Sequence, residues 1–170
     1  MTKGSISMKS LLMTTLLASM MLTFSAPVSI ADENDEKPAV KYKHDFEGQD
    51  LTKRDFSKQN LDNANFADAD LTETNFQGAS LKNCNFRGAV LRATTFYDVD
   101  LTGSDLRDVT FKSPSLSRAI LNKANLSGVD LGGLNVNELK FREANLRNTK
   151  GFGQIYRADF FKADVRGADF

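Results

Sequence analysis

Cysteine and histidine, the residues that often supply a nucleophile and its base, occur once each in this sequence, as Cys84 and His44. Both occupy a position of a five-residue repeat, described below, at which side chains should point inward, so an accessible Cys–His pair is not predicted. We expect Cys84 to be a buried small residue rather than a reactive thiol. A single cysteine also excludes an intramolecular disulfide and a multi-cysteine zinc site.

Carboxylates are plentiful but regularly placed. Many aspartates directly precede a large apolar residue of the repeat: Asp45, Asp50, Asp55, Asp70, Asp100, Asp105 and Asp130. This regularity predicts solvent-exposed positions along a ladder, not the paired carboxylates of general acid–base catalysis. There is no glycine-rich phosphate loop and no metal-binding motif. We therefore expect a protein that is not an enzyme and that carries no cofactor and no metal.

Basic residues form a surface feature that could bind a partner. Arg87, Arg107 and Arg147 follow an apolar residue on one expected side of the fold, and Arg92 and Lys112 do so on the next side. They are interpreted either as a solvated face or as a docking patch for an acidic partner or surface. The 22 Lys and Arg balance the 22 Asp and Glu, so the formal net charge is zero. This balance argues against a nucleic-acid-binding protein.

A repeat of five residues sets all of these positions. From Phe46 to Leu146 every fifth residue, here called a centre, is Phe, Leu or Val. A period of five fits neither one face of an α-helix nor one face of a flat strand. The centres can all point inward only if the chain turns a corner once per repeat, which predicts a solenoid with one repeat on each side of its coil.

The order of the centres predicts a coil with four sides. Phe and Leu alternate strictly from Phe46 to Leu101. In a three-sided coil every Phe would lie on a Leu, whereas in a four-sided coil Phe46, Phe66 and Phe86 form one column. Phe56, Phe76 and Phe96 form the opposite one. Like residues then stack on like, which suits the packing of neighbouring strands.

Two further positions of the repeat have a structural meaning. The position two residues after the centre is often Gly or Asn, for example Gly48, Gly78 and Asn63, and these residues tolerate the positive φ of a turn. The position two residues before the centre is small in the middle coils and should point inward: Ala64, Ala69, Ala79, Cys84 and Ala89.

The segments ANFAD, ADLTE, ANLSG and ANLRN match the A(N/D)LXX consensus, so the chain resembles the pentapeptide-repeat proteins. The resemblance covers residues 44–146 and, more loosely, 153–170, and it implies a right-handed quadrilateral β-helix. The opening DFEGQDLTKRDFSKQNL is similar to exported members of the thylakoid lumen. Some family members look like duplex DNA and bind gyrase, which implies an alternative role as an inhibitor or protector of a topoisomerase. Near-neutral charge and export disfavour that alternative.

Both ends of the repeat depart from the consensus. In the first coil the inward position holds large polar residues that could cap an open edge: His44, Gln49, Arg54 and Gln59. His44 is therefore expected to be a cap rather than a ligand. Toward the other end the same position becomes larger: Pro114, Val129, Leu134 and Leu139. We expect those coils to be wider, or to be distorted near Pro114.

The register breaks after Leu146. We expect an inserted loop at residues 147–154 and a final out-of-register coil at 155–170, with Ile155, Phe160, Val165 and Phe170 as its centres. An open edge there should pair or aggregate. Either a homodimer forms end to end through Phe160, Val165 and Phe170, or this sequence is a piece of a longer product.

The N-terminal segment predicts export. Lys3 and Lys9 precede the apolar run LLMTTLLASMMLTF, and Ser29 and Ala31 are the small residues of a cleavage site, so residues 1–31 are expected to be a signal peptide. Met8 is an alternative start. Residues 32–43 should be a flexible charged lead-in. The expected product is an exported, non-enzymatic scaffold that binds another protein in the periplasm, the thylakoid lumen or the extracellular space, with no stable membrane span after cleavage.

Overall fold

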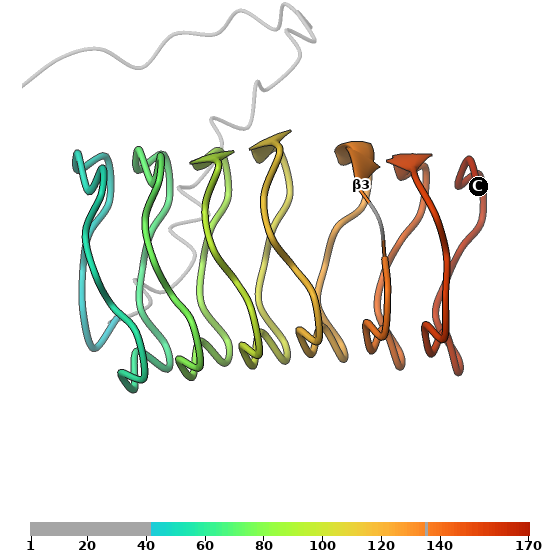
Figure 1. Ribbon diagram of the computed structural model, residues 1–170, viewed down its shortest axis with the longest axis horizontal. Coiled ribbons are helices and arrows are strands. Elements are labelled where there is room, and N and C mark those ends of the chain that lie inside the picture. Colours follow the sequence, from blue (N-terminus) through green and yellow to red (C-terminus); the bar gives the residue numbers. More distant parts are fainter. Residues whose placement is uncertain (1–41, 135) are drawn as a thin grey trace, which may run out of the picture. The chain divides into compact units, whose positions relative to one another are not determined.

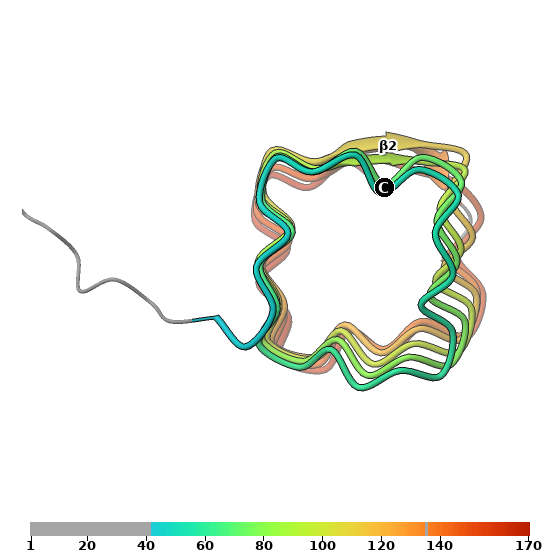
Figure 2. The same ribbon diagram turned by 90° about the vertical axis from the view of Figure 1, so that its left-hand side faces the viewer.

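The computed structural model describes residues 42–134 and 136–170. These residues form a right-handed quadrilateral β-helix, with the four sides that the repeat predicts and the handedness that the family resemblance implies. Seen along its axis, the backbone traces a square with one repeat on each side (Figure 2). The predicted signal peptide, residues 1–31, lies outside the described residues, as does all of the lead-in except Tyr42 and Lys43.

Successive coils pair in parallel (Figure 1). The named strands are β1 (Val90–Arg92), β2 (Thr110–Lys112), β3 (Asp130–Leu134) and β4 (Lys150–Phe152). β1 pairs with β2, and β3 pairs with β4. Elsewhere the coils pair through single-residue bridges, such as Asp45 with Asn65 and Asn65 with Asn85. Because these partners are four repeats apart, each coil has the four predicted sides.

Each corner is a tight turn whose residue two places after the centre has a positive φ. Gly48 occupies this position with φ 65°, as predicted, but Lys53 and Glu73 occupy it too, with φ of 60° and 58°. The side chain before the centre supports the turn, since Asp50 Oδ1 accepts a hydrogen bond of 3.0 Å from the Thr52 amide. This local bond explains the frequent Asp and Asn before the centres.

Stacked aromatic columns fill the first half of the core. The rings of Phe66 and Phe86 stack with centroids 4.9 Å apart, and those of Phe56 and Phe76 stack at 5.3 Å. Phe66 and Phe76 meet edge to face across the interior at 5.5 Å. Both geometries are favourable for aromatic pairs. The predicted columns of like residues are therefore confirmed.

The position two residues before the centre points into the core, as expected. Its small residues are buried: Ala64, Ala69, Ala79, Cys84 and Ala89. Where this residue has a hydroxyl, it donates to a carbonyl of the preceding coil, as from Thr74 Oγ1 to Leu51 O at 2.8 Å and from Ser104 Oγ to Leu81 O at 2.7 Å. These hydroxyls are thus paired, as buried polar groups usually are.

Polar side chains cap part of the first coil, as the sequence predicts. Gln49 Nε2 donates to the Asp45 carbonyl at 3.2 Å, and Gln59 Nε2 donates to the Asp55 carbonyl at 3.5 Å. These bonds satisfy acceptors of the coil at the open edge.

The last coil is displaced by one residue, which the sequence also predicts. Lys140 pairs with Asp159, so one residue fewer separates these partners than in the earlier coils. The segment 147–154, however, contains β4 rather than being an inserted loop throughout. The five residues of β3 lie against the three of β4, and the register shifts between Asp130 and Leu134. Within the described chain the exposed large apolar residues lie in this last coil: Ile155, Tyr156, Phe161, Val165 and Phe170.

The solenoid is interrupted between β2 and β3. These strands belong to different sheets, although they lie on successive coils (Figure 1). In the regular coils the turn amide donates to the next coil, as from Lys53 N to Thr72 O at 2.9 Å and from Ala93 N to Lys112 O at 2.8 Å. Within the described residues, Ser113 makes no such bond. The distortion expected near Pro114 is thus present.

Candidate docking surface

The structure does not bring Cys84 and His44 together. Cys84 is 2% exposed, and its Sγ donates to the Leu61 carbonyl at 3.2 Å. Burial raises the pKa of the Cys84 thiol to about 12, which keeps it protonated and unreactive at neutral pH. His44 lies in the first coil, where its ring stacks on Phe46 with centroids 6.2 Å apart. Because the coil that contains Ala64 lies between them, these two residues form no catalytic pair.

The aspartates before the centres serve the backbone. Asp55 Oδ1 accepts a hydrogen bond of 2.9 Å from the Ser57 amide, and this bond lowers the pKa of Asp55. The pKa of Asp50 is lowered in the same way by the Thr52 amide. Among residues 42–134 and 136–170, no group of three or more His, Cys, Asp or Glu side chains is arranged to hold a metal ion.

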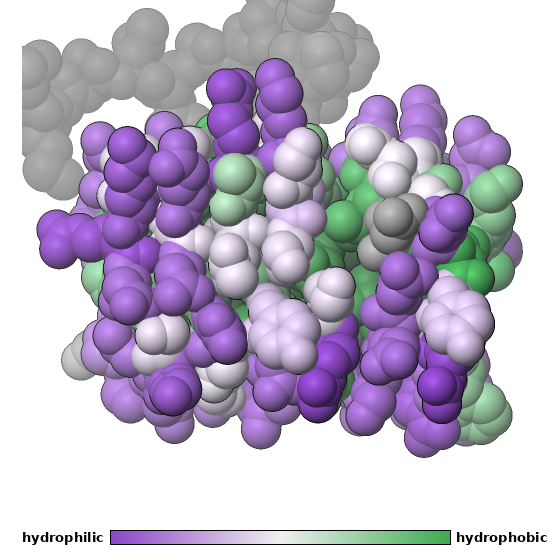
Figure 3. All heavy atoms as spheres, viewed as in Figure 1, coloured by the Kyte–Doolittle hydropathy of each residue, from purple (hydrophilic) through white to green (hydrophobic). Residues whose placement is uncertain are grey.

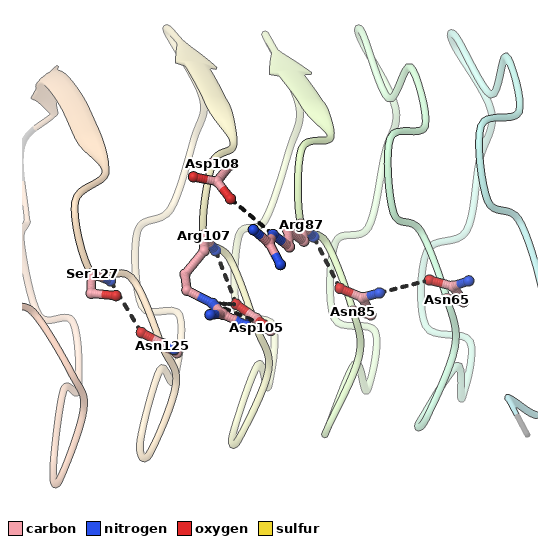
Figure 4. A network of polar contacts seen from close by, with 8 residues as sticks. All are labelled: Asn65, Asn85, Arg87, Asp105, Arg107, Asp108, Asn125 and Ser127. Atoms are coloured by element: carbon pink, nitrogen blue, oxygen red, sulfur yellow. Dashed lines mark hydrogen bonds and ion pairs between the residues drawn. The ribbon is translucent and has the colours of Figure 1, made fainter. Parts of the chain in front are cut away.

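Asparagine side chains connect the coils along one side of the solenoid. Asn85 Nδ2 donates to Asn65 Oδ1 at 3.0 Å (Figure 4), and Asn65 Nδ2 in turn donates to Asp45 Oδ1 at 3.0 Å. In the next coil Asp105 takes this place and binds the Arg107 guanidinium instead. This ladder is therefore structural, and its amides are occupied by neighbouring coils.

Beside this ladder lie the five residues of the predicted basic patch: Arg87, Arg92, Arg107, Lys112 and Arg147. Three of them form ion pairs. Arg87 Nε lies 2.9 Å from Asp108 Oδ2, and Arg107 Nη2 lies 2.6 Å from Asp105 Oδ2 (Figure 4). Arg147 Nε lies 3.8 Å from Asp164 Oδ2. Arg87 and Arg107 each have an acidic partner within the chain, whereas Arg147 shares Asp164 with Arg166, whose Nη2 lies 2.6 Å from the same Oδ2.

Arg92 and Lys112 differ from the other three. They are direct partners in the parallel pairing of β1 with β2, and both are exposed. Neither forms an ion pair with any residue of the described chain. Neighbouring strands lie about 4.8 Å apart, and like charges directly opposite each other are unfavourable. These two cations thus form the uncompensated part of the patch.

A groove that sequence reasoning did not predict lies next to Lys112. It has a volume of about 330 Å³ and is lined by Ser113–Ser117 and by Leu131–Leu134. It is found where β2 and β3 fail to pair, and hydrophobic surface is visible there between more polar coils (Figure 3). Two sequence signals mark it, Pro114 on one wall and the Gly132-Gly133 pair on the other. We call it the β2–β3 groove.

A second hollow, of about 360 Å³, is lined by charged residues of both signs. Arg118 lies on this surface and is held by Asp98 at 3.7 Å and by the Tyr97 hydroxyl at 3.3 Å. Arg142 binds Asp159 at 2.6 Å beside it. Since acidic and basic side chains alternate here and pair with one another, this surface presents no field of one sign.

Within the described residues, no helix is long and apolar enough to span a membrane.

Comparison with known proteins finds solved structures that are similar to this chain. The chain is 21% identical to a trypsin-treated form of QnrB1, a plasmid-mediated fluoroquinolone resistance protein, over 75% of this chain and 72% of that one, with a TM-score of 0.46. It is 24% identical to HetL, a pentapeptide repeat protein involved in heterocyst differentiation regulation from the cyanobacterium Nostoc sp. strain PCC 7120, with coverages of 76% and 62% and a TM-score of 0.31. A pentapeptide repeat protein from the Arabidopsis thaliana thylakoid lumen is 29% identical, with coverages of 74% and 67% and a TM-score of 0.30.

Sequence comparison gives the family. Among curated proteins, none matches this chain significantly in sequence. A family model described as pentapeptide repeats matches in 8 copies, over residues 45–78, 69–108 and 115–149, which is more than half of the chain. With its four-sided coils and stacked centres, the chain belongs to the pentapeptide-repeat family.

Proposed function

We propose that this protein is an exported, non-enzymatic scaffold that binds an acidic region of another protein through its basic patch. The observation that carries the proposal is the juxtaposition of Arg92 and Lys112 on β1 and β2, where two exposed cations lie side by side without an acidic partner in the described chain. An acidic group that approaches both side chains relieves their mutual repulsion.

The rest of the surface supports binding at this place. Arg87, Arg107 and Arg147 lie on the adjacent side of the solenoid and are paired with Asp108, Asp105 and Asp164. They supply a moderately basic rim, which favours encounter with an acidic partner more than it adds affinity. The pairing of β1 with β2 fixes the backbone at both residues, so little backbone entropy is lost on binding.

The alternative role as a topoisomerase inhibitor or protector has less support. A mimic of duplex DNA needs a continuous acidic surface. Here acidic side chains alternate with basic ones along the coils, as in the pairs Lys53–Glu73 and Lys123–Glu143.

Two further parts of the proposal concern location and assembly. The export signal assigned to residues 1–31 takes the protein to the periplasm, the thylakoid lumen or the extracellular space. The apolar centres Phe160, Val165 and Phe170 at the C-terminal edge are proposed to contact a second copy end to end, and Val165 and Phe170 are exposed there.

Affinity capture with the full chain from the cells that produce it tests the docking proposal. The double variant Arg92→Glu/Lys112→Glu is compared with the matched control Lys43→Glu/Lys58→Glu, which makes the same charge change at exposed lysines of the first coil. We expect a protein that the wild type and the control capture and the double variant does not. Identical captures by all three baits would overturn the proposal.

A further inference from the structure

We propose that a second copy of the chain stacks head to tail, with its first coil on the last coil of its neighbour, so that the ladders of one molecule continue into the next. The inference rests on the proposed function, because it assigns which end of a second copy meets the C-terminal edge. It starts from the backbone hydrogen-bonding groups that the two open edges present.

Each regular coil directs a fixed set of backbone groups toward the next coil. Two amides per repeat point that way. The amide of the centre is one of them, as from Phe46 N to Asn65 O at 2.8 Å, and Gly48 N makes the second bond, to Ala67 O at 2.8 Å. One carbonyl accepts in return, as His44 O does from Asn65 N at 2.8 Å. The face of a coil toward the C-terminus is therefore rich in donors, and its other face is rich in acceptors.

The last coil carries this excess of donors on its open face. Within the described residues, four of its amides donate no hydrogen bond: Phe160, Lys162, Val165 and Gly167. Two carbonyls at the positions that face the same way accept none: Ala158 and Ala163. Two such edges brought together would set amides mainly against amides. Because covered amides need acceptors, a contact between two C-terminal edges leaves part of its backbone unpaired.

The first coil presents the complementary groups. Four of its carbonyls occupy positions that accept from a preceding coil: Asp45, Glu47, Asn60 and Asp62. In the described part of the chain, Asp45 O is the one among them that is bonded, by Gln49 Nε2 at 3.2 Å. The first described residues lead away from a corner of the square and do not cross this face (Figure 2). An acceptor-rich edge is thus available to a second copy.

The bridges within the chain show how the two edges match. One ladder of bridges runs from Asp45 to Asp164, and another runs from Asn60 to Asp159. A second copy that continues these ladders stacks apolar centres on one another, Phe46 on Val165 and Leu61 on Phe160. The hydrogen bonds expected between the copies follow the pattern of the regular coils: Val165 N to Asp45 O, Phe160 N to Asn60 O, and Asn60 N to Ala158 O.

The inward positions of the two edges also match in size. In the first coil they hold large polar residues: His44, Gln49, Arg54 and Gln59. In the last coil they hold small residues: Ala158, Ala163 and Ala168. The small residues leave room for the longer side chains of the other edge, whereas two first coils would meet large on large. The first coil of one copy therefore fits the last coil of another better than it fits a second first coil.

A head-to-tail contact joins two different surfaces, so it does not close on itself. Each dimer keeps one free first coil and one free last coil, and further copies can add to either end. The mean mass should therefore keep rising with protein concentration. A contact between two identical edges would stop at the dimer.

The test uses two variants that each block one edge. Gln49→Glu/Gln59→Glu places carboxylates on the first coil, at side chains that are exposed in a single copy and covered in the contact. Phe170→Asp does the same on the last coil, where Phe170 is 59% exposed. Covering an unpaired charge is unfavourable, so each variant should lose the contact at its own edge. Gln77→Glu, at an exposed position of the second coil, is the matched control.

We expect light scattering coupled to size exclusion to show that each blocked variant associates at least about tenfold more weakly than the wild type and Gln77→Glu. An equimolar mixture of the two blocked variants should form dimers that do not grow, because one variant keeps a free last coil and the other keeps a free first coil. In the wild type, association should slow hydrogen exchange at the amides of Asn60 and Val165 alike.

The outcomes separate this inference from the proposed end-to-end contact. If Gln49→Glu/Gln59→Glu dimerises as the wild type does and the mixture gains nothing, the copies meet through two C-terminal edges. Slowed exchange at Val165 without slowing at Asn60 would say the same. Either result overturns the inference and leaves the proposed C-terminal contact standing. A wild type that stays monomeric at every concentration would overturn both.

Discussion

The rings of Phe66 and Phe86 stack with their centroids 4.9 Å apart and their planes 11° apart, although the two residues belong to different coils. Both side chains are fully buried. The contact recurs at each step of the column from Phe46 to Phe86. The coil that contains Phe66 is therefore stabilised by stacking on both of its neighbours, as expected for a protein whose repeats bury a core only by stacking.

Phe86→Ala should destabilise the protein by about 3–5 kcal/mol, because it removes a buried ring and leaves a cavity between two coils. Urea unfolding of the variant measures the loss. Phe46→Ala is the control, since Phe46 is only half-buried at the open end of the solenoid. A loss for Phe86→Ala no larger than that for Phe46→Ala would contradict the stacked core.

The buried thiol of Cys84 should make stability depend on alkaline pH. Burial raises the pKa of Cys84 from its ordinary value of 9.0 to about 12 in the folded chain. The folded state therefore holds its proton where the unfolded state releases it, so this contribution is complete below pH 9 and is lost as the pH rises toward 12. The urea midpoint of the wild type should fall relative to that of Cys84→Ala between pH 8 and pH 11. Parallel pH profiles of the two proteins would contradict this.

Much of the fold follows from the sequence because a repeat constrains every coil in the same way. The strict alternation of Phe and Leu from Phe46 to Leu101 is sufficient to predict the four sides and the columns of the core. The β2–β3 groove could not be predicted in this way, because it arises from hydrogen bonds that two coils fail to make. Pro114, which has no amide hydrogen, and Gly132 signal a local change without specifying its form.

The candidate docking site could be predicted only in part. Composition and spacing place all five basic residues on two adjacent sides. Which of them are compensated depends on acidic side chains that the fold brings close, such as Asp108 beside Arg87 and Asp164 beside Arg147. The sequence alone therefore cannot single out Arg92 and Lys112.

Export predicts a defined mature N-terminus. If residues 1–31 are a signal peptide, the protein recovered from the exported fraction should begin at Asp32. N-terminal sequencing of the purified protein and fractionation of the producing cells measure this. Ala31→Lys should impair processing, whereas Lys37→Ala in the lead-in should not. Export would be contradicted if only the uncleaved chain were found, and only inside the producing cells.

End-to-end contact predicts a dimer that depends on the last coil. Phe170 is 59% exposed, and its ring stacks on that of Phe152 with centroids 4.5 Å apart. Light scattering coupled to size exclusion should find a dimer whose population rises with protein concentration. Phe170→Asp should shift it to monomer, while Lys58→Asp at the surface of the first coil should not. Concentration-independent monomer for the wild type would exclude this interface.

The most direct test of the docking account is the affinity of the captured partner for the chain, measured by calorimetry at low and at physiological salt. We predict that wild-type binding weakens as salt is added and that Arg92→Glu/Lys112→Glu weakens it at least about tenfold. Lys43→Glu/Lys58→Glu should change it by less than about twofold. Equal affinities of the wild type and Arg92→Glu/Lys112→Glu would contradict the account.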